Sequence, residues 1–418
     1  MKNIFFLFLF LINGTLFADE KIYSLELCLD QAIANHPRLK MMNFTLENEK
    51  AKLNIINSKY LPSIDILASY NRLESPLAND KYRAGFEISQ PLFKTEKKLS
   101  ETKITNFTVE TIENEFLLAK TEVVFNVKVA YFKLISAYEF LEIRQNYLKH
   151  TQLFYDTAIE LNRRTKLPRE ETLLRLKAQL NEINQDIISA QTNIKIAEKI
   201  LLNAMGVDRE TELNVGKNLQ IKTITVTFSA DAILQNPEIL RIENQLKLAE
   251  QNENFLKTAM YPEVRAFYNQ AYQLSDFSSR DSEWVLGVNA SFDVWNFWEK
   301  GKTKTEIRRS EIKKRELEEY KNLVWKKLIL ELESAQLEYE SALKKYHLAL
   351  KSLSETKISL DLFEKRYLSG LVSSLELLDS QKTFMQAQVN VANAKFEINI
   401  AKAKIEKIAG LGDKYDHQ

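Results

Sequence analysis

The sequence predicts a mainly helical protein with membrane β-structure, in which long antiparallel coiled-coil helices are combined with four β-strands per chain. Only nine glycines and seven prolines occur in 418 residues, about a third of what average usage would give. Residues 92–167 and 302–369 contain neither, as long uninterrupted helices require. Other short segments alternate apolar and polar side chains, which is typical of strands.

Residues 1–18 are expected to be a secretory signal peptide. A short basic start precedes the apolar stretch Ile4–Ile12, and Ala18 suits cleavage. A membrane anchor is the alternative, but the stretch is too short to span a bilayer. Cys28 is the only cysteine, so no internal disulfide can form. It lies well past the apolar stretch, which argues against a lipid-modified terminus. We therefore expect export to an oxidising compartment.

The chain repeats itself at a shift of slightly over 200 residues. Such self-similarity indicates a duplicated unit, and we predict repeats at 19–209 and 229–418. Residues 210–228 would form a linker or equatorial segment with a short strand near 221–227. The matching pairs are 32–37 with 232–237, 60–62 with 260–262, Gly85 with Gly287, and Gly206 with Gly410.

Each repeat is predicted to contain the same elements in the same order. A first helix (24–59 or 230–259) ends before Pro62 or Pro262, because proline disfavours helix in the residue before it. Two strands, a long helix and a return helix follow. In the first repeat we expect them at about 63–70, 82–92, 94–165 and 169–205. In the second repeat we expect them at about 263–272, 284–295, 302–368 and 373–409.

The strand segments have the pattern of strands that cross lipid. From Trp284 onwards, apolar side chains occupy every second position, and a strand of about ten residues crosses a bilayer. Aromatic residues near the strand ends are typical of an interfacial girdle. Two soluble hairpins packed on helices are the alternative. The girdle residues are Trp284, Trp295, Trp298, Tyr60 and Tyr261.

The long helices are too long for a compact domain. About 65 helical residues extend ~100 Å. Their apolar residues follow three-four heptad spacing, as in Leu328, Leu332 and Ala335, which predicts coiled-coil packing. A simple antiparallel coiled-coil rod, and hence a periplasmic scaffold without a pore, would explain the helices alone.

Four strands cannot close a barrel, since single-chain bacterial barrels begin at eight strands. Open sheet edges are not tolerated in lipid, so several chains must share one barrel. Three chains would supply twelve strands, although the count alone also permits two or four.

The chain resembles the TolC family of outer-membrane efflux and secretion channels over nearly its whole mature length. This resemblance implies a trimer whose 12-stranded β-barrel continues into an α-helical periplasmic barrel. It also implies an outer-membrane location with most of the chain in the periplasm. The segments that carry it are 32–37 (AIANHP), 60–63 (YLPS), 89–93 (SQPLF) and 367–379 (YLSGLVSSLELLD).

The resemblance also implies partners: a periplasmic adaptor (membrane fusion) protein and an inner-membrane pump of the RND or ABC type. The implied function is a passive duct for small molecules, either drugs or metal ions. A duct for type I protein secretion is the alternative within this class.

No enzyme motif is apparent. The four histidines lie far apart, and no phosphate-binding or dinucleotide-binding loop occurs. We expect no catalytic, cofactor or metal site. The net charge of +1 gives no electrostatic reason to bind nucleic acid.

The breaks between long and return helices are the candidate functional residues. In the family these turns form the periplasmic tip, where the adaptor docks and the tunnel narrows. Glu376 and Asp379 match the family's aperture acids, and three copies would place six carboxylates around the mouth. Alternatively, both are ordinary acids near a helix N-terminus, which the helix dipole favours. The predicted docking residues are Thr165, Lys166, Leu167, Pro168, Ser369, Gly370, Leu371 and Val372.

The gate departs from the family pattern at several positions. In the first repeat Thr172 takes the acid position, and Arg175 corresponds to Asp379. Val372 replaces the basic residue that follows the glycine in the family, whereas Tyr367 is kept. A lock would therefore use other contacts, and one hypothesis is that Arg175 pairs with Asp379.

Overall fold

The computed structural model describes residues 22–71, 81–93, 95–165, 170–208, 213–215, 231–258, 261–274, 280–291 and 301–410. The expected signal peptide lies outside these residues. The helices are α1 (Leu25–Asn35), α2 (Pro37–Ser58), α3 (Thr95–Thr165), α4 (Glu170–Met205), α5 (Asp231–Leu234), α6 (Pro237–Thr258), α7 (Lys302–Leu368) and α8 (Ser374–Ile408). The strands are β1 (Ile22–Tyr23), β2 (Ser63–Asn71), β3 (Lys81–Phe93), β4 (Asn214–Val215), β5 (Glu263–Leu274) and β6 (Arg280–Ser291).

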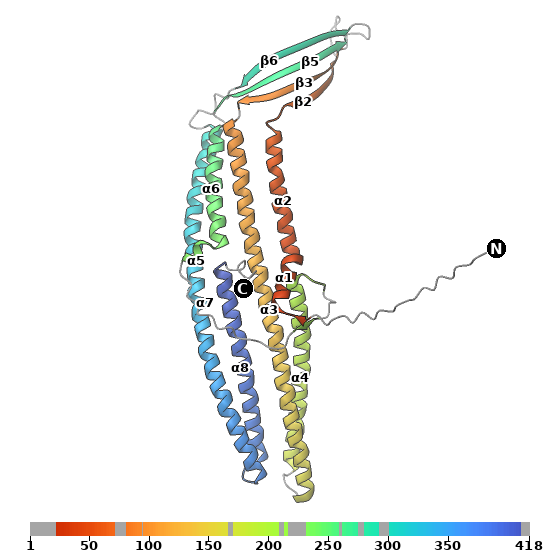
Figure 1. Ribbon diagram of the computed structural model, residues 1–418, viewed down its shortest axis with the longest axis vertical. Coiled ribbons are helices and arrows are strands. Elements are labelled where there is room, and N and C mark those ends of the chain that lie inside the picture. The colour runs from red at the N-terminus through yellow and green to blue at the C-terminus, as the bar shows by residue number, and fades with distance from the viewer. Residues whose placement is uncertain are drawn as a thin grey trace, which may run out of the picture. The chain divides into compact units, whose positions relative to one another are not determined.

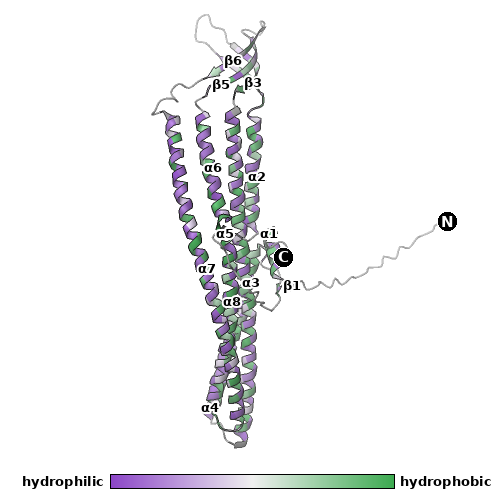
Figure 2. Cartoon of the chain, turned by 60° about the vertical axis from the view of Figure 1, so that its left-hand side comes forward, coloured by the Kyte–Doolittle hydropathy of each residue, from purple (hydrophilic) through white to green (hydrophobic). Residues whose placement is uncertain are grey.

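The predicted fold class is confirmed. Helix α3 has 71 residues and α7 has 67, and four long strands form one antiparallel sheet (Figure 1). Figure 2 shows polar and apolar residues mixed along each long helix. In the part of the chain that the structure describes, no helix is long and apolar enough to cross a membrane.

The chain forms two compact units. One comprises residues up to Ala34, 127–222 and 345–397, and the other comprises 35–126, 223–344 and the segment from Ile398 onwards. The long helices α3, α7 and α8 each contribute to both.

The first unit is a helical bundle with a two-stranded parallel sheet, in which β1 pairs with β4. Helix α4 lies beside α3, and a hydrogen bond joins the two: the Tyr138 hydroxyl of α3 donates to Glu198 of α4 at 2.7 Å. Helix α8 contacts α3 through Lys395 and Glu139, whose ion pair measures 2.7 Å. The core follows the heptad spacing, which places one apolar residue per turn on the same face. Buried residues include Val127, Ala130 and Leu134 of α3 and Leu176, Ile183, Ala190, Ala197 and Leu201 of α4.

The second unit contains the sheet, in the order β2-β3-β5-β6. Strand β3 pairs along most of its length with β5, with Ser89 opposite Phe267. Gly85 permits close contact between these strands, because a Cβ atom there would lie 2.1 Å from the Gln270 carbonyl oxygen. Strands β2 and β6 have no further partner among the described residues, so they form the two edges.

The register of the sheet separates apolar from polar side chains. Since neighbouring residues in paired strands lie on the same face, the pairing places Ile66, Phe86, Gln270 and Trp284 in one row. This face is predominantly apolar, although the register also places polar residues such as Gln270 and Ser282 on it, and Trp284 is 65% exposed. Its apolar members include Ile64, Ile66, Ala68, Tyr70, Tyr82, Ala84, Phe86, Ile88, Val264, Ala266, Tyr268, Tyr272, Trp284, Leu286, Val288 and Ala290.

The opposite face is mainly polar, with Leu67, Phe267 and Val285 as apolar exceptions. On this face Asn269 donates to Glu87 across the strands at 3.2 Å. The polar members include Asp65, Ser69, Arg83, Glu87, Arg265, Asn269, Gln273, Glu283 and Asn289.

The first helix of each predicted repeat is divided in two, whereas the sequence predicts one continuous helix. The segment expected at 24–59 divides into α1 and α2 at His36, and that expected at 230–259 divides into α5 and α6 at Asn236. In both cases proline follows, and it holds the preceding residue out of the helical region. His36 has φ −60° and ψ 124°. Its Nδ1 accepts from the Arg38 N–H at 3.2 Å, so the histidine caps α2.

One strand begins earlier than expected. Strand β6 (Arg280–Ser291) begins at Arg280, rather than at about 284, because its pairing with β5 continues to Leu274. Residues 292–295 of the expected strand lie outside the described residues. The strand expected near 221–227 lies outside the described residues, and the structure has β4 at Asn214–Val215.

Cys28 gives a direct test of the packing of α1. Its side chain is 0% exposed, and burial raises the pKa of its thiol to about 12. Because the thiolate is the reactive form, Cys28 should resist maleimide in the native protein and react fully in urea. The control is Cys28→Ser with Asp30→Cys, which places a thiol at an exposed position of α1. Native labelling of Cys28 as fast as the control would contradict this packing.

Candidate functional site: the helix tip and the strand junction

The turn from α7 to α8 is fixed by backbone hydrogen bonds. The Leu371 N–H donates to Arg366 at 3.0 Å, and the Gly370 N–H donates to Tyr367 at 2.9 Å. These two bonds define a Schellman motif, which requires a left-handed residue. Gly370 supplies it with φ +70°, and no atom lies within 4 Å of the position that a Cβ would take. The backbone conformation, not crowding, therefore favours glycine here.

Helix α8 begins with a capping box. The Glu376 N–H donates to the Ser373 hydroxyl at 3.3 Å, and Glu376 Oε2 accepts from the Ser373 N–H at 2.8 Å. Oε2 also accepts from the Ser373 hydroxyl at 2.7 Å. These reciprocal bonds satisfy donors at the helix start. The side-chain and backbone hydrogen bonds from Ser373 lower the pKa of the Glu376 carboxyl.

Beneath this turn, a small apolar cluster joins four helices. Phe154 and Ala158 of α3, Leu176 of α4 and Leu377 of α8 are buried together. Tyr367 of α7 packs edge-on against Phe154, with ring centroids 4.9 Å apart. The Tyr367 phenol also accepts from the Ser374 hydroxyl at 3.3 Å. This tip cluster holds the two helical hairpins together inside one chain.

The remaining predicted gate residues lie on the surface of the tip. Asp379 and Arg175 are exposed and Thr172 is half-buried. Among the ion pairs between described residues, none joins Arg175 to Asp379. Their pairing therefore stays a prediction. The two acids differ in their contacts: Glu376 caps a helix, whereas the Asp379 carboxylate makes no hydrogen bond or ion pair with the described residues.

Of the predicted docking residues, Lys166, Leu167 and Pro168 lie outside the described residues, and Thr165 is the last residue of α3. Ser369, Gly370, Leu371 and Val372 form the described turn. Sequence reasoning missed Leu368, which is 80% exposed beside Leu371 at 76%. Their apolar character within a polar turn was the available signal.

Tyr147 of α3 is a second residue that the sequence did not reveal. It is buried near the tip. Burial raises the pKa of its phenol to about 12, and the carboxylates of Glu182 and Asp379 add to the increase. The phenol therefore stays neutral at physiological pH.

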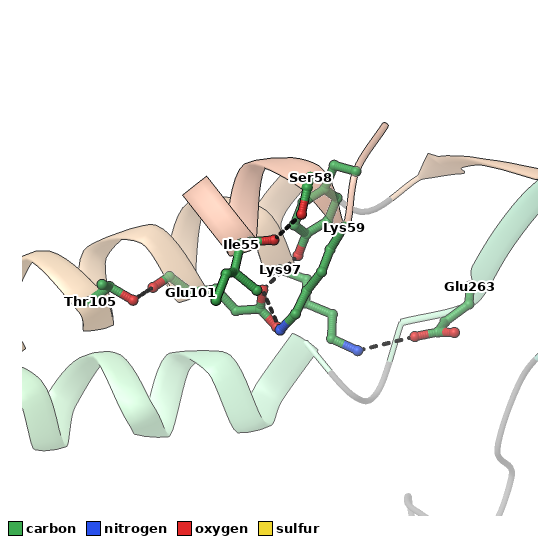
Figure 3. Close-up of polar contacts among 8 residues, drawn as sticks. Ile55, Ser58, Lys59, Lys97, Glu101, Thr105 and Glu263 are labelled. Carbon is green, nitrogen blue, oxygen red and sulfur yellow. Dashed lines mark hydrogen bonds and ion pairs between the residues drawn. The ribbon is translucent and has the colours of Figure 1, made fainter. Parts of the chain in front are cut away.

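The junction between helices and strands is held by a polar network in the second unit (Figure 3). Lys97 at the start of α3 pairs with Glu263 at the start of β5 at 3.1 Å. Lys59, after α2, lies 4.0 Å from Glu101 of α3. The Tyr60 hydroxyl donates to the same Glu101 carboxylate at 3.2 Å. The network thus fixes where two helices meet the sheet.

The predicted girdle residues are only partly described. Tyr60 is half-buried and Tyr261 is exposed, each shortly before a strand. Trp284 is exposed on the apolar face of β6. Trp295 and Trp298 lie outside the described residues.

The described part of the site contains no metal centre. Among the described residues, no group of three His, Cys, Asp or Glu side chains is placed to hold a metal ion. The arrangement offers an apolar sheet face, a polar sheet face and a helix tip with exposed leucines and the exposed carboxylate of Asp379.

Comparisons with known proteins point to one family of outer-membrane proteins. The family described as "Outer membrane efflux protein" matches residues 28–207 and 229–411. The probable outer membrane lipoprotein SilC of Salmonella typhimurium is 23% identical over 95% of this chain and 87% of its own. The cation efflux system protein CusC of Escherichia coli K12 is 21% identical over 95% of this chain and 88% of its own.

Solved structures share the fold. A crystal structure of CusC superposes with a TM-score of 0.81 at 17% identity, covering 92% of this chain and 91% of that one. The open state of the MtrE outer membrane channel of Neisseria gonorrhoeae gives 0.81 at 19% identity, covering 94% and 90%.

The capping box predicts different effects for the two acids. Glu376→Ala should lower the thermal stability of the protein at pH 7, and Asp379→Ala should not. Ser373→Ala, which removes the other half of the box, should cost about 1 kcal/mol. Thermal unfolding of the three variants measures this.

The pH dependence has a defined sign. Because the folded-state pKa of Glu376 lies below its ordinary value of 4.5, its contribution is present above pH 4.5 and is lost as the pH falls through the folded value. The difference between wild type and Glu376→Ala should therefore shrink on acidification. Equal stability of the two proteins at pH 7 would rule out the capping role.

Proposed function

The chain belongs to the outer membrane efflux protein family, and we propose that three copies of it form a passive duct across the outer membrane. Small molecules would pass through this duct, driven by an inner-membrane pump of the RND or ABC type through a periplasmic adaptor. Residues 19–209 and 229–418 would be duplicated halves of each subunit. The double family match, at 28–207 and 229–411, supports this division.

The observation that carries the proposal is the two-faced sheet with open edges. Its apolar face exposes Trp284, Leu286 and Val288, which is favourable in lipid and costly in water. Its polar face suits a water-filled lumen. Both edges must be paired in lipid, and β6 of one chain can pair antiparallel with β2 of the next. Three chains of four strands give a closed barrel of twelve.

The helix tip is the proposed contact with the adaptor. Leu368 and Leu371 are exposed at the turn, and an apolar protein surface would cover them. Asp379, with its carboxylate unbonded among the described residues, would line the aperture together with Glu376. The ring of acids would attract cations and oppose closure.

Cation cargo is favoured over protein secretion by the relatives. CusC is named a cation efflux system protein, and SilC and CusC both align over 95% of this chain. We therefore propose small cations as the transported class. A scaffold without a pore would leave the apolar sheet face exposed to water.

The chain differs from a lipoprotein in the place of its cysteine. SilC is named a probable lipoprotein, whereas the single cysteine here is buried within α1. We propose that Cys28 packs in the core and carries no acyl chain.

The shared barrel predicts a detergent-dependent trimer. Membranes that contain the protein should retain it through salt and carbonate washes, because the sheet is embedded in lipid. Detergent should extract a particle with the mass of three chains, which heat separates into monomers. Light scattering and native mass spectrometry measure this mass. A water-soluble monomer obtained without detergent would contradict the proposal.

The acids at the aperture should govern conductance. In planar bilayers, Glu376→Ala with Asp379→Ala should alter single-channel conductance and reduce cation preference. Asp379→Ala alone should produce most of the change, since Glu376 is bound in its capping box. The matched control removes two exposed acids from the middle of α7, with Glu333→Ala and Glu340→Ala. Unchanged currents in the tip double variant would refute the aperture assignment.

A further inference from the structure

Helix α7 begins with a strongly basic stretch, here called the basic segment, residues 302–315. It contains seven Lys or Arg residues and two Glu residues. The next four residues include Glu316, Glu318 and Glu319, so the charge reverses along the same helix. The whole chain has a net charge of only +1. The positive charge is therefore concentrated at one end of α7.

The packing of α7 places this segment beside the sheet. The Ser310 hydroxyl donates to the Ala249 carbonyl of α6 at 3.0 Å, and Lys321 pairs with Glu243 of α6 at 2.7 Å. The two helices are thus antiparallel, and Ser310 is level with Ala249. The start of α7 is then level with Thr258, the last residue of α6, shortly before β5 begins at Glu263.

Most of the basic side chains of this segment form no ion pair with the described residues. Thr303 and Leu317 are buried and Ser310 faces α6, which defines the packed face. Lys302, Arg308, Arg309 and Arg315 are exposed. Within the described residues, the segment forms one ion pair, between Lys313 and Glu316 at 2.7 Å. Cations in a first helical turn also oppose the helix dipole, so they do not serve to stabilise α7.

We propose that the basic segment binds the anionic headgroups of phospholipids in the periplasmic leaflet of the outer membrane. This inference rests on the proposed function, which embeds the sheet in lipid. The headgroup layer extends about 5–8 Å beyond each face of the hydrocarbon. Lys302 and Lys304 reach this layer directly. Arg308 and Arg309, about one to two turns further on, reach it with extended side chains and within about one Debye length.

The test uses the full-length trimer in nanodiscs. Discs of pure phosphatidylcholine are compared with discs that contain phosphatidylglycerol, and native mass spectrometry measures the lipids that remain bound. The wild type should retain phosphatidylglycerol in preference, and high salt should weaken this preference. Inorganic phosphate added to phosphatidylcholine discs should not change the stability of the trimer, which separates a lipid site from a free-phosphate site.

The variant with Lys304→Gln, Arg308→Gln and Arg309→Gln should reduce the preference at least about fivefold. The matched control removes three exposed lysines further along α7, with Lys326→Gln, Lys344→Gln and Lys357→Gln, and should keep it. Arg308→Lys with Arg309→Lys, which keeps the charge, should also keep it.

Three results would overturn the inference. The first is a wild type that retains phosphatidylglycerol no better than phosphatidylcholine. The second is a control variant that loses as much of the lipid preference as the triple variant. The third is dissociation of the triple variant in phosphatidylcholine discs, which would show that the segment pairs with a neighbouring chain. A conducting trimer without the preference would refute this inference alone. Failure to form any trimer in membranes would instead refute the proposed function.

Discussion

An antiparallel sheet of four strands leaves rows of backbone donors and acceptors open along β2 and β6. Water satisfies such edges in a soluble protein, but lipid cannot, and each unpaired group costs several kcal/mol there. The exposed apolar face of the same sheet favours lipid. These two requirements are met together only when chains share a barrel. The oligomer is therefore a condition of membrane insertion, and it follows from the strand count.

The helices are also held in place by contacts within the chain. The long helices α3 and α7 are each followed by a return helix, and in the first unit the tip cluster around Phe154 and Leu377 joins all four. In the second unit, Lys97, Glu101 and Glu263 fix the helices to the sheet. Each unit is thus held by its own local contacts. The exposed leucines and Asp379 at the tip are left available for other chains.

Much of this was predictable because the relevant signals are local. The lengths of α3 and α7 follow from the absence of Gly and Pro, and the heptad spacing identifies Leu328 and Leu332 as buried. The break at His36 was missed although Pro37 follows it, because the helical pattern continues on both sides. The register that brings Ile66, Phe86 and Trp284 into one row depends on tertiary pairing. Glu376 shows how one pattern serves two roles, since Ser373-x-x-Glu376 is also a capping box. Burial of Tyr147 has no signature in sequence.

The most direct test is covalent linkage of the two sheet edges. Single cysteines are placed on β2 and β6 in a Cys28→Ser background, at several pairs of positions, and the protein is oxidised in native membranes. The account predicts that matched pairs give a ladder of cross-linked products ending at three chains. It also predicts that pairs with both cysteines on β2 give none. Absence of cross-links between β2 and β6 at every register, or a ladder that continues beyond three chains, would contradict the shared barrel.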